Sequence, residues 1–268
     1  MFTNLVRIQQ IRFYKSRAFQ LGAVATVLAA AFVWFISFGM YVDAGIIESA
    51  SEGNHVYYQT SSGQIFSMML TIFCVVNITF MVCDYYKYRT MVNIAGSVHN
   101  RFKRLAADIA GVFLTAPVIS LSVLLAMALG VIGDGWQNLF AKLYPRGLMW
   151  IYIGTVITML CAMMKTVALS KIFRKKGAVI SVYYLINLAE IFAMGIASGF
   201  SEPDMTVTVD SYYEELISAI SAPGTYITYE GLGVPHLFSI PTLFMFAFIL
   251  IAFWTIIATV ADGRRNEL

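Results

Sequence analysis

The sequence predicts an all-α, polytopic membrane protein with six transmembrane helices. Of its 268 residues, 59% are hydrophobic and 12% are charged, whereas a soluble domain carries about 25% charged residues. The apolar residues gather in six runs of about 20 residues or more, which is long enough for a helix to cross a hydrocarbon core while satisfying its own backbone hydrogen bonds. The runs are Leu21–Val42, Ser62–Cys83, Leu105–Gly133, Leu148–Ser170, Ala178–Phe200 and Leu237–Ala261.

Lysine and arginine fall almost entirely in alternate segments between these runs. The N-terminal segment, the loop at residues 84–104, the loop at residues 171–176 and the C-terminal tail are basic, whereas the other loops hold most of the carboxylates. The positive-inside rule places the basic segments in the cytoplasm. We therefore expect a single membrane domain, residues 1–268, in the plasma membrane with both termini cytoplasmic.

The N-terminal segment has the pattern of an amphipathic helix. Residues 1–19 mix apolar Leu5 and Ile8 with Arg7 and Arg12 at helical spacing. A basic amphipathic helix lies in the membrane interface, so we expect an elbow helix that leads into the first span. The alternative is an unstructured basic terminus that only sets the topology.

The longest external segment, residues 201–236, predicts short helices between the fifth and sixth spans. A serine followed three residues later by a glutamate forms a capping box, which should open a helix over Ser211–Ala222. The Pro223-Gly224 pair should stop this helix. A second short element is expected at residues 226–234.

Motifs of soluble-enzyme chemistry are absent from the sequence. It contains no phosphate-binding loop, no paired-histidine zinc motif and no nucleophile elbow. The histidines are scattered over different loops, and the cysteines lie within spans, where we expect them to be small packing residues. These six residues are His55, His99, His236, Cys74, Cys83 and Cys161. We therefore expect no catalytic residue, no metal site and no cofactor bound by this chain.

One polar stripe lies inside the fifth span. Tyr183, Asn187 and Glu190 follow one another at helical spacing, and Glu190 falls near the middle of the bilayer. A carboxylate at that depth is costly and marks a functional residue by default. The stripe predicts either an intramembrane pathway or dimer seam, or a structural hydrogen bond between helices.

Three further residues inside the spans have local interpretations. Lys165 lies close to the cytoplasmic end of the fourth span, where we expect its ammonium to reach toward the cytoplasmic interface. Asp108 follows Arg104 by four residues, which favours a local ion pair. Pro117 lies inside the third run and should kink that helix.

The cytosolic loop at residues 84–104 carries a recognisable pattern. It reads Asp84-Tyr85-Tyr86-Lys87-Tyr88-Arg89-Thr90-Met91-Val92-Asn93-Ile94, followed by Arg101 before the third run. This loop resembles that of type-2 ABC exporter permeases, the transmembrane subunits of six-span ABC transporters. The resemblance extends to the basic elbow, the six spans, the cytoplasmic termini and the long external segment. The chain departs from the family pattern at Arg89, where glycine is common, and at His99-Asn100-Arg101.

The resemblance implies a coupling helix at Thr90–Asn100, seated in a cleft of a separate cytosolic ATPase subunit that binds ATP and Mg²⁺. It implies coupling residues along that helix and a partly re-entrant gate in residues 201–236. It also implies a second permease, either another copy or a paralogue, and no nucleic-acid partner. The residues expected to couple to the ATPase are Thr90, Asn93, Ser97, His99 and Arg101.

The expected function is therefore the outward transport of a hydrophobic or amphipathic substrate, such as a peptide, an antimicrobial or a lipid, by a permease without an ATPase site of its own. Two alternatives remain open from the sequence. One is a self-contained secondary carrier or channel, which predicts more intramembrane charges or broken helices. The other is a membrane assembly factor that transports nothing.

Overall fold

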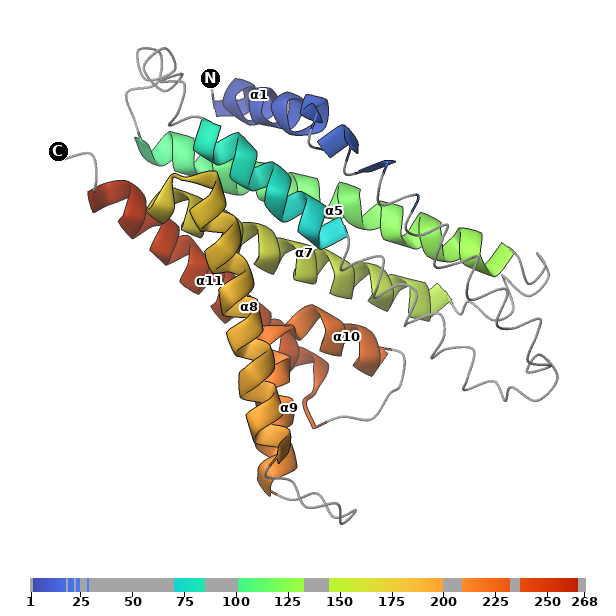
Figure 1. Ribbon diagram of the computed structural model, residues 1–268. Coiled ribbons are helices and arrows are strands. Elements are labelled where there is room, and N and C mark those ends of the chain that lie inside the picture. The colour runs from blue at the N-terminus through green and yellow to red at the C-terminus, as the bar shows by residue number, and fades with distance from the viewer. Residues whose placement is uncertain are drawn as a thin grey trace.

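The computed structural model describes residues 2–17, 19–21, 23, 24 and 28, followed by residues 70–84, 101–132, 145–199, 209–231 and 237–264. Every regular element in this part of the chain is a helix, which confirms the all-α prediction there (Figure 1). The elements are α1 (Phe2–Lys15), the helix Leu70–Asp84, α5 (Arg101–Ile132), α7 (Pro145–Phe173), α8 (Lys176–Gly199), α9 (Val209–Ser221), α10 (Pro223–Gly231) and α11 (Ile240–Arg264).

Three of the described helices are long and apolar enough to cross a membrane: Met149–Phe173, Lys176–Ala193 and Ile240–Asp262. They coincide with the fourth, fifth and sixth predicted runs, so the chain is a multi-pass membrane protein. The first run lies almost entirely outside the described residues, and the second is described from Leu70 onward. The number of six spans therefore stays a prediction. The third run forms α5, which continues as a helix through Pro117.

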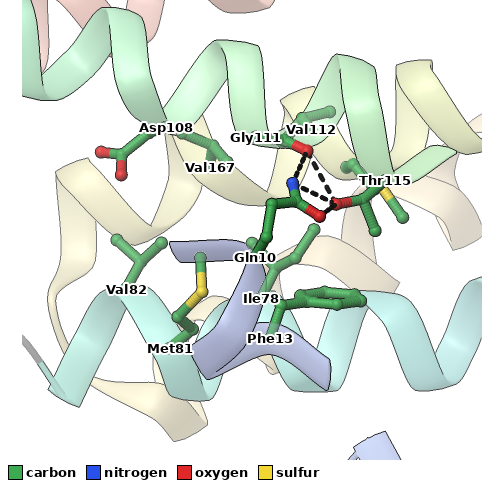
Figure 2. A pocket seen from close by; sticks show the side chains of 11 residues that line it. Gln10, Phe13, Ile78, Met81, Val82, Asp108, Gly111, Val112, Thr115 and Val167 are labelled. Atoms are coloured by element: carbon green, nitrogen blue, oxygen red, sulfur yellow. Dashed lines mark hydrogen bonds between the residues drawn. The ribbon is translucent and has the colours of Figure 1, made fainter. Parts of the chain in front are cut away.

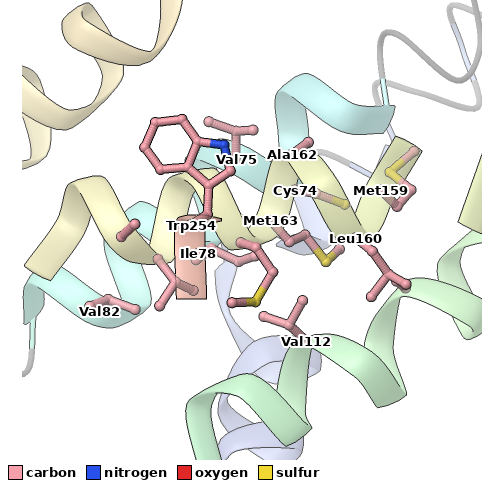
Figure 3. Close-up of a cluster of buried hydrophobic side chains, with 14 of the residues drawn as sticks. Cys74, Val75, Ile78, Val82, Val112, Met159, Leu160, Ala162, Met163 and Trp254 are labelled. Atoms are coloured by element: carbon pink, nitrogen blue, oxygen red, sulfur yellow. The ribbon is translucent and has the colours of Figure 1, made fainter. Parts of the chain in front are cut away.

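Helix α7 is the centre of the bundle, since 78% of its most apolar stretch is buried, compared with 11% for α8 and 22% for α11. Neighbouring helices pack around it. Figure 3 shows Met163 of α7 among Ile78 of the Leu70–Asp84 helix, Val112 of α5 and Trp254 of α11. The three cysteines are buried and unbridged, which confirms their interpretation as packing residues. Helices α8 and α11, at the periphery, expose long apolar faces.

The N-terminal segment is a packed helix, so the alternative of an unstructured terminus is wrong for residues 2–15. Phe13 is buried in the main core. The side-chain amide of Gln10 donates to the carbonyl of Gly111 in α5 at 2.9 Å. The Ser16 hydroxyl donates to Oδ1 of Asn77 at 2.5 Å, and the Asn77 amide donates to the Phe13 carbonyl at 3.3 Å. These bonds tie the predicted elbow to two apolar helices of the bundle.

The described part of the segment between α8 and α11 forms two helices, as expected, although their boundaries differ. Helix α9 begins at Val209, so Ser211 lies inside the helix and is not its N-cap as predicted. The helix ends at Ser221, close to the predicted stop. Pro223 and Gly224 do more than stop it, because Pro223 is also the first residue of α10. Proline suits that position, since its missing N–H would have no partner in the first turn of a helix. The second element therefore begins three residues earlier than predicted.

Candidate functional site

The predicted coupling residues fall at the edge of the described structure. Thr90, Asn93, Ser97 and His99 lie outside the described residues, and Arg101 is described only as the first backbone position of α5. Their role in ATPase coupling stays a prediction.

The polar stripe of α8 converges on a lysine of α7. The Lys165 ammonium donates a hydrogen bond to the side-chain amide oxygen of Asn187 at 2.7 Å and forms an ion pair with Glu190 Oε1 at 2.9 Å. Two aromatic rings complete its surroundings. The centroid of the Tyr183 ring lies 5.3 Å from the ammonium nitrogen, and that of the Trp254 ring of α11 lies 6.0 Å away. We call these five residues the Lys165 cluster.

The expectation that Lys165 reaches toward the cytoplasmic interface is wrong. Its side chain is 8% exposed and points into the bundle. The physical reason is the direction of side chains on a helix, which lean toward the N-terminus. In the predicted topology the N-terminal end of α7 is external, so Lys165 extends away from the cytoplasm and toward mid-bilayer.

The connection between α7 and α8 explains why the stripe meets this lysine. Only Arg174 and Lys175 separate the two helices, and Arg174 adopts the left-handed conformation with φ of 56°. So short a link keeps the first part of α8 beside the end of α7, and α8 then runs obliquely away from it (Figure 1). Lys165 lies about 12 Å before the end of α7, and Glu190 lies about 21 Å after the start of α8. The long lysine side chain, leaning away from the link, spans this difference.

The Lys165 cluster surrounds the ammonium with hydrogen-bond acceptors and aromatic rings. A carboxylate and an amide oxygen receive its N–H bonds, and the two ring faces attract its charge. The cluster therefore ties α7 to α8 and α11. The burial is uneven, because the lysine is 8% exposed while the glutamate side chain is 35% exposed. The positive partner is enclosed and the negative partner opens to the outside of the bundle.

A second charged group lies nearer the predicted cytoplasmic ends of the helices. The Lys171 ammonium of α7 contacts Asp108 of α5 at 2.9 Å and Asp262 of α11 at 3.5 Å. Asp108 therefore has a cross-helix partner in Lys171; the side chain of Arg104 lies outside the described residues, so its expected pairing with Asp108 stays a prediction. Lys176 of α8 pairs with Asp84 at 2.7 Å. Asp84 and Asp108 flank the predicted coupling loop on its two sides, so both of its ends are anchored to other helices.

A small cavity separates α1 from the helices beneath it (Figure 2). Gln10 reaches across this space, and its amide nitrogen bonds both Gly111 and the Thr115 hydroxyl, each at 2.9 Å. Apolar side chains such as Ile78 and Met81 line the rest. The cavity has room for about one water molecule. The hydrogen bonds of Gln10 anchor α1 to α5, and the cavity is too small for a substrate. Within the described helices, no three His, Cys, Asp or Glu side chains gather as metal ligands.

Helix α10 packs backbone to backbone against α7. A Cβ atom placed on Gly224 would collide with the Gly154 carbonyl and the Thr158 hydroxyl, and would lie 2.7 Å from the Thr158 amide nitrogen. One placed on Gly154 would collide with the Thr228 hydroxyl and the Gly224 carbonyl. Only glycine permits this approach at both positions. Gly154 lies inside the span Met149–Phe173, so α10 reaches alongside the membrane-crossing part of α7.

No protein-family model matches this sequence, and no curated protein matches it either. The function therefore has to be inferred from the residues and their geometry, together with the resemblance carried by residues 84–104.

Proposed function

We propose that this chain is the six-span permease subunit of an ATP-driven ABC exporter that moves a hydrophobic or amphipathic substrate outward. A separate cytosolic ATPase subunit, binding ATP and Mg²⁺, powers it, and a second permease completes the pathway. Both termini lie on the cytoplasmic side of the plasma membrane. The described part of the chain supplies the membrane-embedded helices of such a permease.

The observation that carries this proposal is the helix pair α9–α10 between α8 and α11. An exporter of this type needs an element that closes the external end of the pathway and is linked to the spans. Helix α10 satisfies this requirement because Gly154 and Gly224 bring it into direct contact with the central helix α7. Helix α9 is linked to the start of the last span, since Glu215 Oε1 accepts the backbone N–H of Leu237 at 2.6 Å. A movement of α7 or α11 would therefore move this pair.

The cytoplasmic ion pairs support the same proposal from the opposite end. A coupling helix transmits force only if the helices on both sides of it are held by the bundle. Asp84 is held by Lys176 of α8, and Asp108 is held by Lys171 of α7. A push on residues 85–100 would therefore reach α7 and α8, which carry the Lys165 cluster.

Copurification tests the proposal directly. The full chain is expressed in its native host and purified in mild detergent. We expect a phosphate-loop ATPase of that host to copurify in stoichiometric amount. ATP turnover of the complex should fall about tenfold or more in Asn93→Ala and Arg101→Ala. The exposed Lys103, two residues further along α5, provides the matched control, and Lys103→Ala should leave turnover unchanged. If no ATPase copurifies, or if Arg101→Ala and Lys103→Ala behave alike, the proposal is wrong.

The Lys165 cluster favours one alternative, a self-contained secondary carrier. A buried ion pair between adjacent spans is the kind of group that carriers use to couple transport to a proton or ion gradient. The carrier requires no ATPase partner. It predicts uptake driven by an imposed proton or sodium gradient in proteoliposomes that contain this chain alone, and loss of that uptake in Glu190→Gln. Absence of gradient-driven uptake would exclude it.

A further inference from the structure

The outer face of α8 presents a carboxylate among apolar side chains. Glu190 is 35% exposed, and within the described residues only its Oε1 oxygen has a partner. Helix α8 is the least buried of the three candidate spans, so this face meets lipid, a ligand or a second copy of the chain. A carboxylate facing lipid is unfavourable unless a cation approaches it. Lys165 supplies that cation on the inner side, and the second carboxylate oxygen can still accept a hydrogen bond from a cation that approaches the outer face.

The contacts of Lys165 show which kind of cation Glu190 and its neighbours bind. The chain's own primary ammonium, on Lys165, is held by Glu190, by Asn187 and by the faces of Tyr183 and Trp254. The two oxygen acceptors require N–H donors, which a primary ammonium has and a quaternary ammonium lacks. The site therefore selects for a primary ammonium by hydrogen bonding as well as by charge.

The surroundings of Glu190 on the helix surface are suited to a hydrocarbon chain. Ala189 and Ala193, on one side of it, are small and exposed, so they leave the carboxylate accessible. Beyond them lie large exposed apolar residues: Leu185 is 62% exposed, Phe192 63% and Ile196 61%. A ligand whose head group binds Glu190 can lay an apolar tail along these side chains and remain in a hydrocarbon environment.

We propose that the outer face of α8 around Glu190 binds an amphipathic primary ammonium, whose head group shares the Glu190 carboxylate with Lys165 or takes it over. This inference rests on the proposed export function and deepens it, because it names cationic amphipaths as the substrate class. When α7 and α8 separate, the same carboxylate, amide oxygen and tyrosine ring of α8 become available to the ligand. Lys165 thus occupies the site in the resting state and competes with the ligand for it.

Binding of radiolabelled dodecylammonium tests the proposal without any ATPase. The full chain is placed in nanodiscs of zwitterionic phosphatidylcholine, and saturable binding is measured by scintillation proximity. We expect Glu190→Gln, which keeps the shape and removes the charge, to lower affinity about tenfold or more, as is typical for losing a charge-assisted hydrogen bond. Lys165→Met should raise affinity, since it removes the competing ammonium. Unlabelled dodecyltrimethylammonium should compete poorly, and dodecanol should not compete.

Asp84 provides a matched control. Its side chain is also 35% exposed and paired with a lysine, so Asp84→Asn should leave dodecylammonium binding unchanged. Glu190→Asp, which retains the charge, should keep part of the affinity and shows that loss in Glu190→Gln is not a folding defect. Equal affinity of wild type and Glu190→Gln would overturn the proposal. So would absence of saturable binding to wild type, as expected if lipid alone or a second copy of the chain covers this face. Neither result would change the copurification test, so the two proposals fail separately.

Discussion

Substituting Gly224 by alanine should destabilise the protein by breaking the contact between α10 and α7. The added methyl group would meet two backbone atoms, the Gly154 carbonyl oxygen and the Thr158 amide nitrogen at 2.7 Å, as well as the Thr158 hydroxyl. Backbone atoms of a central helix cannot shift as the end of a flexible side chain can, so α10 has to move away. Overpacking of this kind costs about 1–3 kcal/mol, and the gain in helix propensity from glycine to alanine, about 1 kcal/mol, offsets only part of a larger clash.

The effect should appear as a lower midpoint of thermal unfolding in detergent. Two signals measure this midpoint: intrinsic fluorescence and loss of the monodisperse peak in size-exclusion chromatography. The net loss is then up to about 2 kcal/mol, which corresponds to a fall of up to roughly 8 °C for a chain of this size. Gly154→Ala should behave similarly. The double variant should lose less than the sum of the two, because both substitutions disrupt one contact.

Gly177, at the start of α8, is the control for this pair. A Cβ atom there would have no neighbour within 4 Å, so Gly177→Ala should leave the unfolding midpoint unchanged or raise it slightly. If Gly224→Ala were as stable as Gly177→Ala, the close packing of α10 on α7 would be refuted, and with it the structural basis for a gate that moves with the spans.

Three further comparisons test the charged and polar groups. Lys165→Met should destabilise the bundle by about 3 kcal/mol because it leaves Glu190 without its cation, and adding Glu190→Gln should restore part of the loss. Thermal unfolding measures both, and a double variant that is worse by the full sum would contradict the pairing. Lys171→Met should lower the unfolding midpoint more than Lys176→Met, since Lys171 is 2% exposed and Lys176 is 29% exposed; equal effects would contradict the burial of the Lys171 contacts. Asn77→Ala, which removes the buried anchor of α1, should make residues 2–17 more susceptible to limited proteolysis, and unchanged cleavage would contradict that anchor.

The periodic features of the sequence were predictable, because they depend on spacing along one helix. The stripe of Tyr183, Asn187 and Glu190 on one face of α8 follows from 3.6 residues per turn alone. The existence of α9 and its end before Pro223 were predictable, but its start was not, because α9 begins at Val209, two residues before the predicted N-cap Ser211. The burial of Cys74 follows from its position in an apolar run.

Partners on other helices were not predictable from spacing. Lys171 from α7 contacts Asp108, and the spacing along α5 carries no signal of a partner on another helix. The position of the Lys165 ammonium depends on the direction of its side chain as well as on the distance of the residue from the helix end. The close contact of Gly224 with α7 has only a weak signal, a glycine after a proline, which also fits a simple turn. Coupling by Thr90, Asn93, Ser97, His99 and Arg101 remains a prediction, since their side chains lie outside the described residues.

The source of energy distinguishes the proposed exporter from a carrier most directly. Inside-out membrane vesicles that contain this chain and its copurifying ATPase are given radiolabelled dodecylammonium, with ATP and Mg²⁺ or with an imposed proton gradient. We predict accumulation that requires ATP, disappears in Arg101→Ala and persists when the proton gradient is collapsed. Accumulation driven by the proton gradient in the absence of ATP, above that of vesicles without this chain and insensitive to Arg101→Ala, would contradict the account.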